Sequence, residues 1–473
     1  MGTINAAMSV IGGALDADQE ALSVVSNNVA NANTPGYTQE KPNWQENPPI
    51  TIGGIQIGDG VMETGATSQR DRVLQERLDQ QQQLAAASST RLTALNNIQA
   101  LFTPDSGSSS AAAGDIGSDV TSFFDSFSSL EAAPTDNALR EQVLSSASTL
   151  AGDISSAANS LNGQSAALSQ AATGIATQVN SLTGAIAQLN LQIESTSPKA
   201  DAGTLEDQRQ QDLSQLSQLI GINQVTTENN GLTVTTTSGQ LLVSEGQSFQ
   251  LTTGTVNGAT DFFLGGADDT SQLASGGGQL GGYLTARSVD IPNALASLDQ
   301  LAYSISTSVN TQNNAGIDLD GATGTAANPL NIFNAPAQVA GSAASMTVVM
   351  TDPNQIAAAT AGKGTGDNSN AVVLAGLANQ TIVNGQTPVN YYSNFVSTLG
   401  STVLEVQTEN TAQNASVTQL QTQNNALSRV NLNDEAAAMS TLETSYQAAS
   451  QVFTLLNTVM ASALNLGVET AVA

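Results

Sequence analysis

The sequence contains no cysteine and no histidine. Without cysteine the chain can form neither a disulfide nor a catalytic thiolate. Without histidine it has no Ser-His-Asp triad, no imidazole acid–base catalyst and none of the usual zinc sites. These two absences exclude many classes of enzyme and metalloprotein.

Basic residues and long apolar runs are also scarce. Eleven Lys and Arg stand against 40 Asp and Glu, so the net charge is −29. The bases are scattered, and without a basic patch nucleic acid and anionic membrane surfaces are poor partners. No apolar run approaches the ~18 residues of a membrane-spanning helix. The strong acidity fits a soluble, extracellular protein.

The two ends of the chain carry matching heptad repeats. Apolar residues recur there at alternating steps of three and four, with Asp18 as the only polar residue on the N-terminal stripe. A 3.5-residue repeat favours pairing with a second helix. We therefore predict that the first and last helices pair as a coiled coil whose seam is the assembly interface. The predicted interface comprises Ile4, Met8, Ile11, Leu15, Leu22, Val25, Val29, Met439, Leu442, Tyr446, Phe453, Leu456 and Met460.

The middle of the chain is predicted to be helical with one β insertion. The length allows two to four domains. The predicted fold is mainly α, with the terminal coiled coil, a long-helix bundle and one inserted β-rich outer domain. The domain bounds are 1–35 and 431–473 for the terminal coiled-coil domain, 36–220 and 280–430 for the helical bundle domain with extended and hairpin segments, and 221–279 for the β-rich domain.

Periodicity and turn residues place the individual elements. Helices are predicted at 68–102, around 123–130, at 154–193, 205–220, 291–310 and 391–427, with a helix cap at 135–137. A linker is predicted at 104–117 and a hairpin strand at 346–350.

A tight turn is predicted directly after the first helix, which should end near Ala32. Pro35 presets φ at the second turn position, and Gly36 supplies positive φ at the third, as a type II turn requires. The turn completes the segment SNNVANANTPGY at 26–37. Its motif residues are Asn27, Asn28, Asn31, Asn33, Thr34, Pro35, Gly36 and Tyr37.

This segment resembles the N-terminal signature of the bacterial flagellar axial proteins, which comprise rod, hook and hook-associated proteins. The segments VNLNDE at 430–435, YQAAS at 446–450 and LNLG at 464–467 resemble their C-terminal signature. Interior segments resemble the hook-associated members in particular. These are 136–150, 277–281, 295–310, 314–319, 351–357 and 366–371.

The resemblance implies a structural, non-enzymatic protein without cofactors at the junction between flagellar hook and filament. Members of that group pass unfolded through the flagellar export channel and assemble as a ring on the hook tip. Implied partners are copies of the same chain, the hook protein, a second hook-associated junction protein, and an export chaperone at the C-terminal region. The implied location is extracellular. No Lys or Arg precedes Lys41, so we expect export without a cleaved signal peptide.

Four short motifs have simpler interpretations than catalysis or ligand binding. The glycines at 276–281 fit G-x-G-x-x-G without a clear preceding strand, which favours a turn. The segment 362–365 fails the spacing of a phosphate loop. The segment 318–321 lacks the later ligands of a calcium loop. Asp268 and Asp269 are adjacent acids that usually face solvent, although paired carboxylates also serve glycoside hydrolysis.

Three functions therefore remain open. The first is a hook–filament junction protein, and the second is a hook or rod subunit, which would lack the interior matches. The third is a secreted hydrolase or adhesin, supported only by the acidic composition and the β insertion. The short β region departs from the commoner pattern of the family, and we predict a single outer domain.

Overall fold

The computed structural model describes residues 2–52, 54–103, 115–196, 201–227, 230–256 and 258–469. The chain divides into two compact units. Unit 1 comprises Met1–Gln83, Gln178–Leu251 and Asn414–Ala473, and unit 2 comprises Leu84–Thr177 and Thr252–Gln413. The division between Leu251 and Thr252 runs through the segment predicted as one β domain, and the three-domain division stays a prediction.

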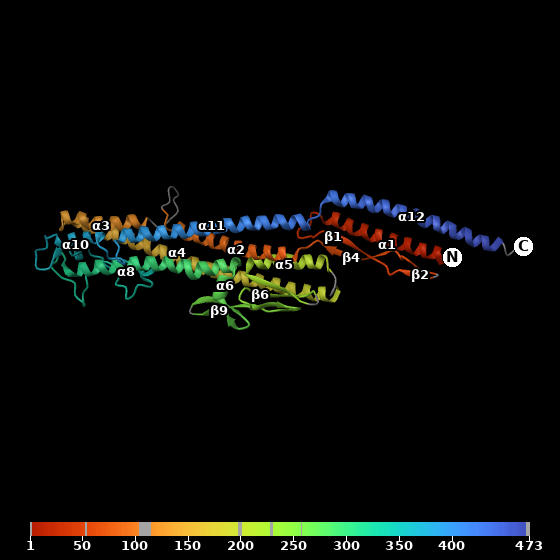
Figure 1. Cartoon of the computed structure of the whole chain (residues 1–473). Coiled ribbons are helices and arrows are strands. Elements are labelled where there is room, and N and C mark those ends of the chain that lie inside the picture. Colours follow the sequence, from red (N-terminus) through yellow and green to blue (C-terminus); the bar gives the residue numbers. More distant parts are fainter. Residues whose placement is uncertain are drawn as a thin grey trace. The chain divides into compact units, whose positions relative to one another are not determined.

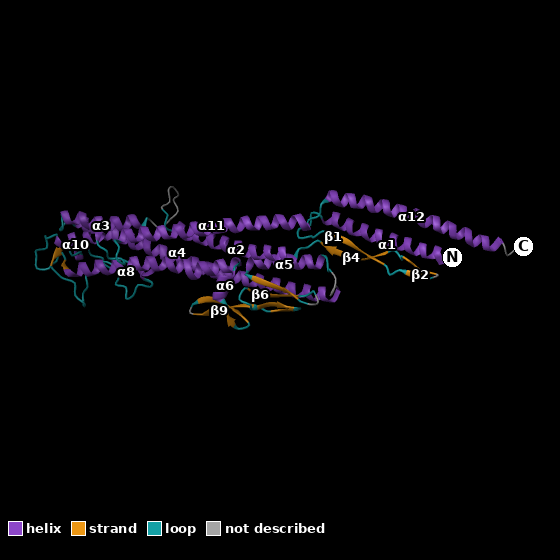
Figure 2. Cartoon of the chain, in the orientation of Figure 1, coloured by secondary structure: helices purple, strands orange, loops and turns teal. Residues whose placement is uncertain are grey.

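Helices dominate the described chain, which confirms the predicted fold class (Figures 1 and 2). The helices are α1 (Gly2–Asn31), α2 (Arg72–Ala100), α3 (Ile116–Ala132), α4 (Asn137–Thr196), α5 (Thr204–Leu219), α6 (Thr270–Gly276), α7 (Gly278–Thr285), α8 (Ile291–Ala315), α9 (Ser342–Ser345), α10 (Ser369–Gly376), α11 (Pro388–Ser428) and α12 (Leu432–Glu469). A π-helical turn, Ala286–Asp290, joins α7 to α8.

The strands form small antiparallel sheets. They are β1 (Glu40–Glu46), β2 (Ile50–Ile52), β3 (Ile55–Ile57), β4 (Val61–Ser68), β5 (Ile222–Thr226), β6 (Leu232–Thr236), β7 (Leu241–Ser244), β8 (Gln247–Ser248), β9 (Leu251–Val256), β10 (Ala259–Leu264), β11 (Ala267–Asp268), β12 (Gly316–Ile317) and β13 (Ala359–Thr360). The sheet orders are β1-β4, β2-β3, β5-β6-β7-β8, β11-β10-β9 and β12-β13.

Two predicted elements differ from the structure. The prediction of a hairpin strand at Met346–Met350 is wrong, because this segment forms only an isolated bridge between Val348 and Phe333. The helix expected at 154–193 is part of α4, which begins at Asn137 and has 60 residues. Most of the linker predicted at 104–117 lies outside the described residues, which resume at Asp115. The Asp115 side chain caps α3 by accepting a hydrogen bond from the Gly117 amide.

Unit 1 holds its four-stranded sheet against the end of α4. The buried Asn190 side chain donates to the carbonyls of Leu232 (2.8 Å) and Glu245 (2.8 Å). Asn180 forms two bonds with the backbone of Leu251. In β6 the side chains alternate between buried and half-buried, as predicted from its Leu-Thr-Val-Thr pattern. These amides satisfy strand-end carbonyls that would otherwise be orphaned.

Unit 2 has one continuous apolar core. Phe123, Phe124 and Phe127 of α3 are fully buried there, and Phe123 packs edge-on against Phe333 with ring centroids 5.4 Å apart. Helices α2, α4, α8, α10 and α11 contribute further core residues, and so do loop residues such as Met346 and Ile356. Ring pairs of this geometry add about 0.5–1.5 kcal/mol beyond their burial.

Arg140 of α4 is almost fully buried and binds backbone rather than an acid. Its guanidinium donates to the carbonyls of Pro134 (2.8 Å), Pro353 (3.3 Å), Asn354 (3.3 Å) and Ile356 (2.6 Å). Burial lowers the pKa of the Arg140 guanidinium, and Asp318 partly opposes this effect. One side chain therefore supports a long loop between α9 and α10.

Two acids meet where α3 packs on α4. Burial and the neighbouring Asp153 carboxyl raise the pKa of Asp119 to about 7, and the charge of Asp115 acts in the same direction. One Asp119 oxygen and the Tyr392 hydroxyl are both buried without a hydrogen-bond partner among the described residues. Burial and the charges of Asp115 and Asp119 also raise the pKa of the Tyr392 hydroxyl.

We expect Asp119→Asn to stabilise the protein at pH 8. The unfolded chain loses the Asp119 proton near pH 4 and the folded chain near pH 7, so wild-type stability should fall as the pH rises between these values. After allowance for solvent screening, we expect the free energy of unfolding of Asp119→Asn at pH 8 to exceed that of wild type by about 1 kcal/mol, which corresponds to roughly 2–4 °C in Tm. Thermal unfolding at pH 4 to 8 measures it. The exposed Asp125 of α3 is the control, and equal pH profiles for wild type and Asp119→Asn would contradict the prediction.

Candidate functional site: the terminal helix pair and its motif turn

Helices α1 and α12 pack along each other within unit 1, and β1 and β4 also pack against α1 (Figure 1). Most predicted seam residues are half-buried in this arrangement. On α1 these are Ile4, Met8, Ile11, Leu15 and Leu22, and on α12 they are Met439, Leu442, Phe453, Leu456 and Met460. Val25 is buried, whereas Val29 (39% exposed) and Tyr446 (37% exposed) are not. The structure thus brings most of the predicted stripe together.

Of the four best-covered positions of α1, only Val25 belongs to the predicted stripe. Ala17, Ala21, Val25 and Asn28 are the buried residues of this helix. Small side chains at 17 and 21 allow close approach of the neighbouring backbone. The half-buried Asp18 has one buried carboxylate oxygen without a partner among the described residues.

A second apolar stripe on α12 faces outward. Val452, Leu455, Val459 and Leu464 are between 42% and 64% exposed. Three of them recur at steps of three and four, as in a second helix-pairing face. The terminal pair therefore buries one stripe of α12 and leaves another uncovered.

The motif turn begins where α1 ends. The Tyr37 amide donates to the Thr34 carbonyl (3.2 Å), and Gly36 has φ +81°. This geometry confirms the predicted type II turn, in which the third residue, here Gly36, has positive φ and the second does not. Asn27, Asn33, Thr34, Pro35 and Gly36 are exposed, and Asn31 and Tyr37 are half-buried. Asn31 bonds to Asn27 and Thr34, which closes the end of the helix.

Asn28 is the centre of the motif. Its side chain is 1% exposed and uses both its oxygen and its nitrogen. The oxygen accepts from the Tyr37 hydroxyl (2.9 Å) and the Glu40 amide (3.0 Å). The nitrogen donates to the Glu40 carbonyl (2.7 Å) and to the Glu435 carboxylate of α12 (3.2 Å). Gln39 donates to the same Glu435 carboxylate (2.6 Å).

A cluster of charges anchors the far side of the turn. Thr38 donates to Asp207 of α5 from its amide (2.9 Å) and its hydroxyl (2.7 Å). Arg70 bridges Asp207 (2.5 Å) and Glu206, and its side chain is 10% exposed. Burial, followed by the charges of Glu40, Asp207 and Glu435, raises the pKa of the Tyr37 hydroxyl. Tyr37 therefore stays protonated across the physiological pH range and donates a hydrogen bond to Asn28.

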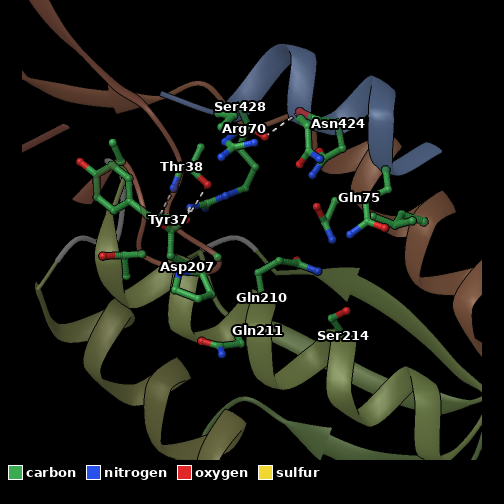
Figure 3. Close-up of a pocket in the computed structure, with 18 of the residues that line it drawn as sticks. Tyr37, Thr38, Arg70, Gln75, Asp207, Gln210, Gln211, Ser214, Asn424 and Ser428 are labelled. Atoms are coloured by element: carbon green, nitrogen blue, oxygen red, sulfur yellow. Dashed lines mark hydrogen bonds and ion pairs between the residues drawn. The ribbon is translucent and has the colours of Figure 1, made fainter. Parts of the chain in front are cut away.

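A polar cavity of about 450 Å³ opens between the motif turn, α2, α5 and the end of α11 (Figure 3). Carboxamides dominate its lining, and Leu78 is its main apolar contact. The carboxamide residues are Asn33, Gln75, Gln82, Gln210, Gln211, Gln421, Asn424 and Asn425.

The short motifs of the alternative functions have structural roles. The Asp268 carboxylate accepts from the Thr270 amide (3.0 Å) and hydroxyl (2.7 Å) at the start of α6, while Asp269 is 2% exposed. Gly277 separates α6 from α7, and both Gly277 and Gly278, the first residue of α7, have positive φ. Asp318 accepts from the Ala322 amide (2.7 Å) in a loop turn. Within the described part of the chain, no group of three or more acids could hold a metal ion, and no helix could cross a membrane.

Comparison with known proteins agrees with this architecture. The family of the flagellar hook-associated protein FlgK helical domain matches residues 105–327, and the family of flagella basal body rod proteins matches residues 8–38. The chain is 26% identical to flagellar hook-associated protein 1 of Salmonella typhimurium over 561 aligned positions, which cover 98% of this chain and 99% of that protein.

The chain is therefore similar to flagellar hook-associated protein 1 over nearly its full length.

Other known proteins show the same similarity. The chain is 24% identical to flagellar hook-associated protein 1 of Escherichia coli and 25% identical to that of Bacillus subtilis, covering 98% and 96% of this chain and 99% and 96% of those proteins. The solved flagellar hook junction protein FlgK from Burkholderia pseudomallei has the same fold, with a TM-score of 0.64 and 19% identity. The comparison covers 74% of this chain and 99% of that one.

The comparison also bears on the short β region. The alignment with the Salmonella protein has 561 positions, although this chain has only 473 residues. The Salmonella protein therefore has segments without counterparts here.

Several residues of this site escaped the sequence analysis. Glu435 was recognised only as part of a signature, and Gln39, Arg70 and Asp207 were not singled out. The composition does predict that a buried Arg contacts an acid, because the chain has 40 Asp and Glu and only 11 Lys and Arg. Nothing in the local sequence says which of the acids Arg70 contacts, since Asp207 lies 137 positions away.

We expect Asn28→Ala to loosen the contact between α1 and α12. The substitution leaves the Glu40 carbonyl, the Glu40 amide and the Tyr37 hydroxyl without their partner. At about 1–3 kcal/mol for an unsatisfied buried group, the expected loss is roughly 2–4 kcal/mol. Hydrogen exchange across α1 and α12 measures it. The exposed neighbour Asn27 provides the control, and unchanged exchange in Asn28→Ala would contradict a central role for Asn28.

Proposed function

We propose that this protein is a structural subunit of the bacterial flagellum that assembles at the hook tip and forms the hook–filament junction. The observation that carries the proposal is the similarity to hook-associated protein 1 over nearly the full length of both chains. A hook or rod subunit is the alternative, favoured by the rod-protein match at residues 8–38. The interior match at 105–327 favours the hook-associated function.

The terminal pair is the proposed assembly element. Its outward stripe on α12 gives neighbouring copies an apolar face to cover, and burial of such surface drives association. We propose that copies of the chain contact one another through α1 and α12. The hook protein and the second hook-associated junction protein then bind on either side.

Export precedes assembly in this proposal. The subunit leaves the cell through the flagellar export channel, and an export chaperone binds its C-terminal region. The absence of cysteine supports this route, because the exported chain refolds without disulfide pairing.

Deletion of the gene in its own host tests the proposal. Electron microscopy should show hooks without filaments, and immunoblotting should detect flagellin released into the medium. Loss of the hooks themselves would identify a hook or rod subunit. Normal filaments would refute an axial role.

Assembly of purified subunits should strengthen with salt. Helices α1 and α12 contain seven acids, which are Asp16, Asp18, Glu20, Asp434, Glu435, Glu443 and Glu469, and no Lys or Arg. Side-by-side pairs therefore repel each other, and raising NaCl from about 0.01 to 0.15 M shortens the screening length from roughly 30 to 8 Å. Sedimentation of the subunit with isolated hooks measures binding. A decrease with salt would show that opposite charges hold the interface.

A further inference from the structure

The carboxamide-lined cavity beside the motif turn has no role in the function proposed so far. It is lined from four elements of unit 1 and lies at the point where the terminal pair joins the rest of that unit. Figure 3 shows Gln75, Gln210 and Asn424 around the space between α5 and α11.

The acids and the central base of this cavity are saturated. Asp207 accepts two bonds from Thr38 and one from Arg70. Arg70 is neutralised by Asp207 and Glu206. The exposed Arg429 is the remaining base of the lining. An anionic ligand such as a phosphate would therefore find little attraction, and a cation would find no unpaired carboxylate among the lining residues.

The carboxamides, by contrast, are largely unengaged. Gln421, Asn424 and Asn425 of α11 make no side-chain hydrogen bond among the described residues. Gln210 of the lining donates to Asp79 of α2 (2.8 Å), and its carboxamide oxygen accepts no hydrogen bond from the described residues. Each free carboxamide offers one acceptor and two N–H donors.

The cavity is also held in a fixed shape. Asp79 is 1% exposed and accepts from Gln210 and from Gln224 of β5 (2.9 Å), so it ties α2 to α5. Ser214 donates to Gln82 (2.8 Å), and the turn itself is held by Asn28. A preorganised polar surface loses little entropy when a ligand binds.

The ligand that fits these groups is neutral and presents donors and acceptors in alternation. A polypeptide backbone has this pattern, because the peptide group and the carboxamide are the same chemical unit. Leu78, which is 4% exposed, is the apolar contact at the cavity floor for one side chain of such a segment.

We propose that this cavity binds an extended backbone segment of a second copy of the chain. The inference rests on the proposed function, because the cavity belongs to the same unit as α1 and α12 and neighbouring copies would reach it during assembly. The site would then add sequence-tolerant, hydrogen-bonded contacts to the apolar contacts of the helices.

The absence of cysteine makes a clean test possible. We would introduce Gln421→Cys, attach a benzophenone photo-cross-linker through a maleimide, and irradiate flagella assembled from this variant. The expected product is a covalent dimer of the chain, with the second copy identified by mass spectrometry. Gln423→Cys is the matched control, since Gln423 is exposed on the same helix and does not line the cavity.

The other outcomes overturn the proposal. Cross-links to a different protein would assign the cavity to another partner, and cross-links within one chain would show that no second copy enters it. Thiol labelling should slow at least about tenfold on assembly for Gln421→Cys but not for Gln423→Cys. Equal labelling before and after assembly would show an unoccupied cavity.

A double substitution tests the contribution of the site. Asn424→Ala with Asn425→Ala removes two unengaged carboxamides and should lower incorporation at the hook tip about tenfold, as expected for the loss of one or two hydrogen bonds. Gln423→Ala should incorporate normally. Normal incorporation of the double variant would refute the inference alone, whereas failure of the wild-type chain to reach the hook tip would refute the proposed function.

Discussion

The Phe453→Asp variant should fail to assemble at the hook tip while unit 2 stays folded. Phe453 is half-buried on the stripe of α12 that packs against α1. A carboxylate there would be desolvated in a helix pair that contains seven acids and no base. We expect incorporation to fall by more than about a hundredfold, equivalent to roughly 3 kcal/mol.

The control for this experiment adds the same charge elsewhere on α12. Gln451 is exposed, so Gln451→Asp should assemble almost normally. Complementation of a deletion strain and immunoblotting of isolated flagella measure incorporation, and circular dichroism checks that the subunit is folded. Normal assembly of Phe453→Asp would show that the predicted seam is not required. Leu22→Asp, on the facing helix, should behave like Phe453→Asp.

The Arg140→Met variant should destabilise unit 2 by about 3–5 kcal/mol, the range for removing one partner from a buried charged network. The methionine fills much of the space but leaves four carbonyls, those of Pro134, Pro353, Asn354 and Ile356, without their donor. The expected fall in Tm is roughly 10 °C. Hydrogen exchange should show the loss first in the loop around residue 354.

Two variants make this prediction specific. Arg77 is exposed on α2, so Arg77→Met should leave stability almost unchanged. Arg140→Lys keeps the charge but lacks the planar fork that reaches several carbonyls, so it should lie between wild type and Arg140→Met. If Arg140→Met lowers the free energy of unfolding by less than about 1 kcal/mol, water replaces the guanidinium as the donor to these carbonyls.

The features that could be predicted from the sequence depend on near neighbours in the chain. Heptad spacing predicted both terminal helices and the stripe at Met439, Leu442, Phe453, Leu456 and Met460 that is half-buried in the structure. Pro35 and Gly36 predicted the turn, because a type II turn depends on the φ angles of two adjacent residues. The signatures at both ends predicted the family.

Elements whose stability depends on packing were predicted less well. The strand expected at Met346–Met350 had suitable residues, but a strand also needs a partner, and Val348 forms only one bridge. The helix predicted at 154–193 was too short, because α4 begins at Asn137 and tertiary packing supplies most of the stability of a helix.

The sequence by itself determined that the chain is helical, that its two ends are suited to pair, and that its motif turn follows the first helix. Only the tertiary structure decided that Asn28 contacts Glu435, 407 positions away, that Arg70 bridges Glu206 and Asp207, and that Arg140 supports a loop more than 200 positions further on. Local spacing sets helices and turns through bonds between residues a few positions apart. A buried polar group instead takes whichever partner the folded chain brings within hydrogen-bond distance, and that choice leaves no periodic pattern in the sequence.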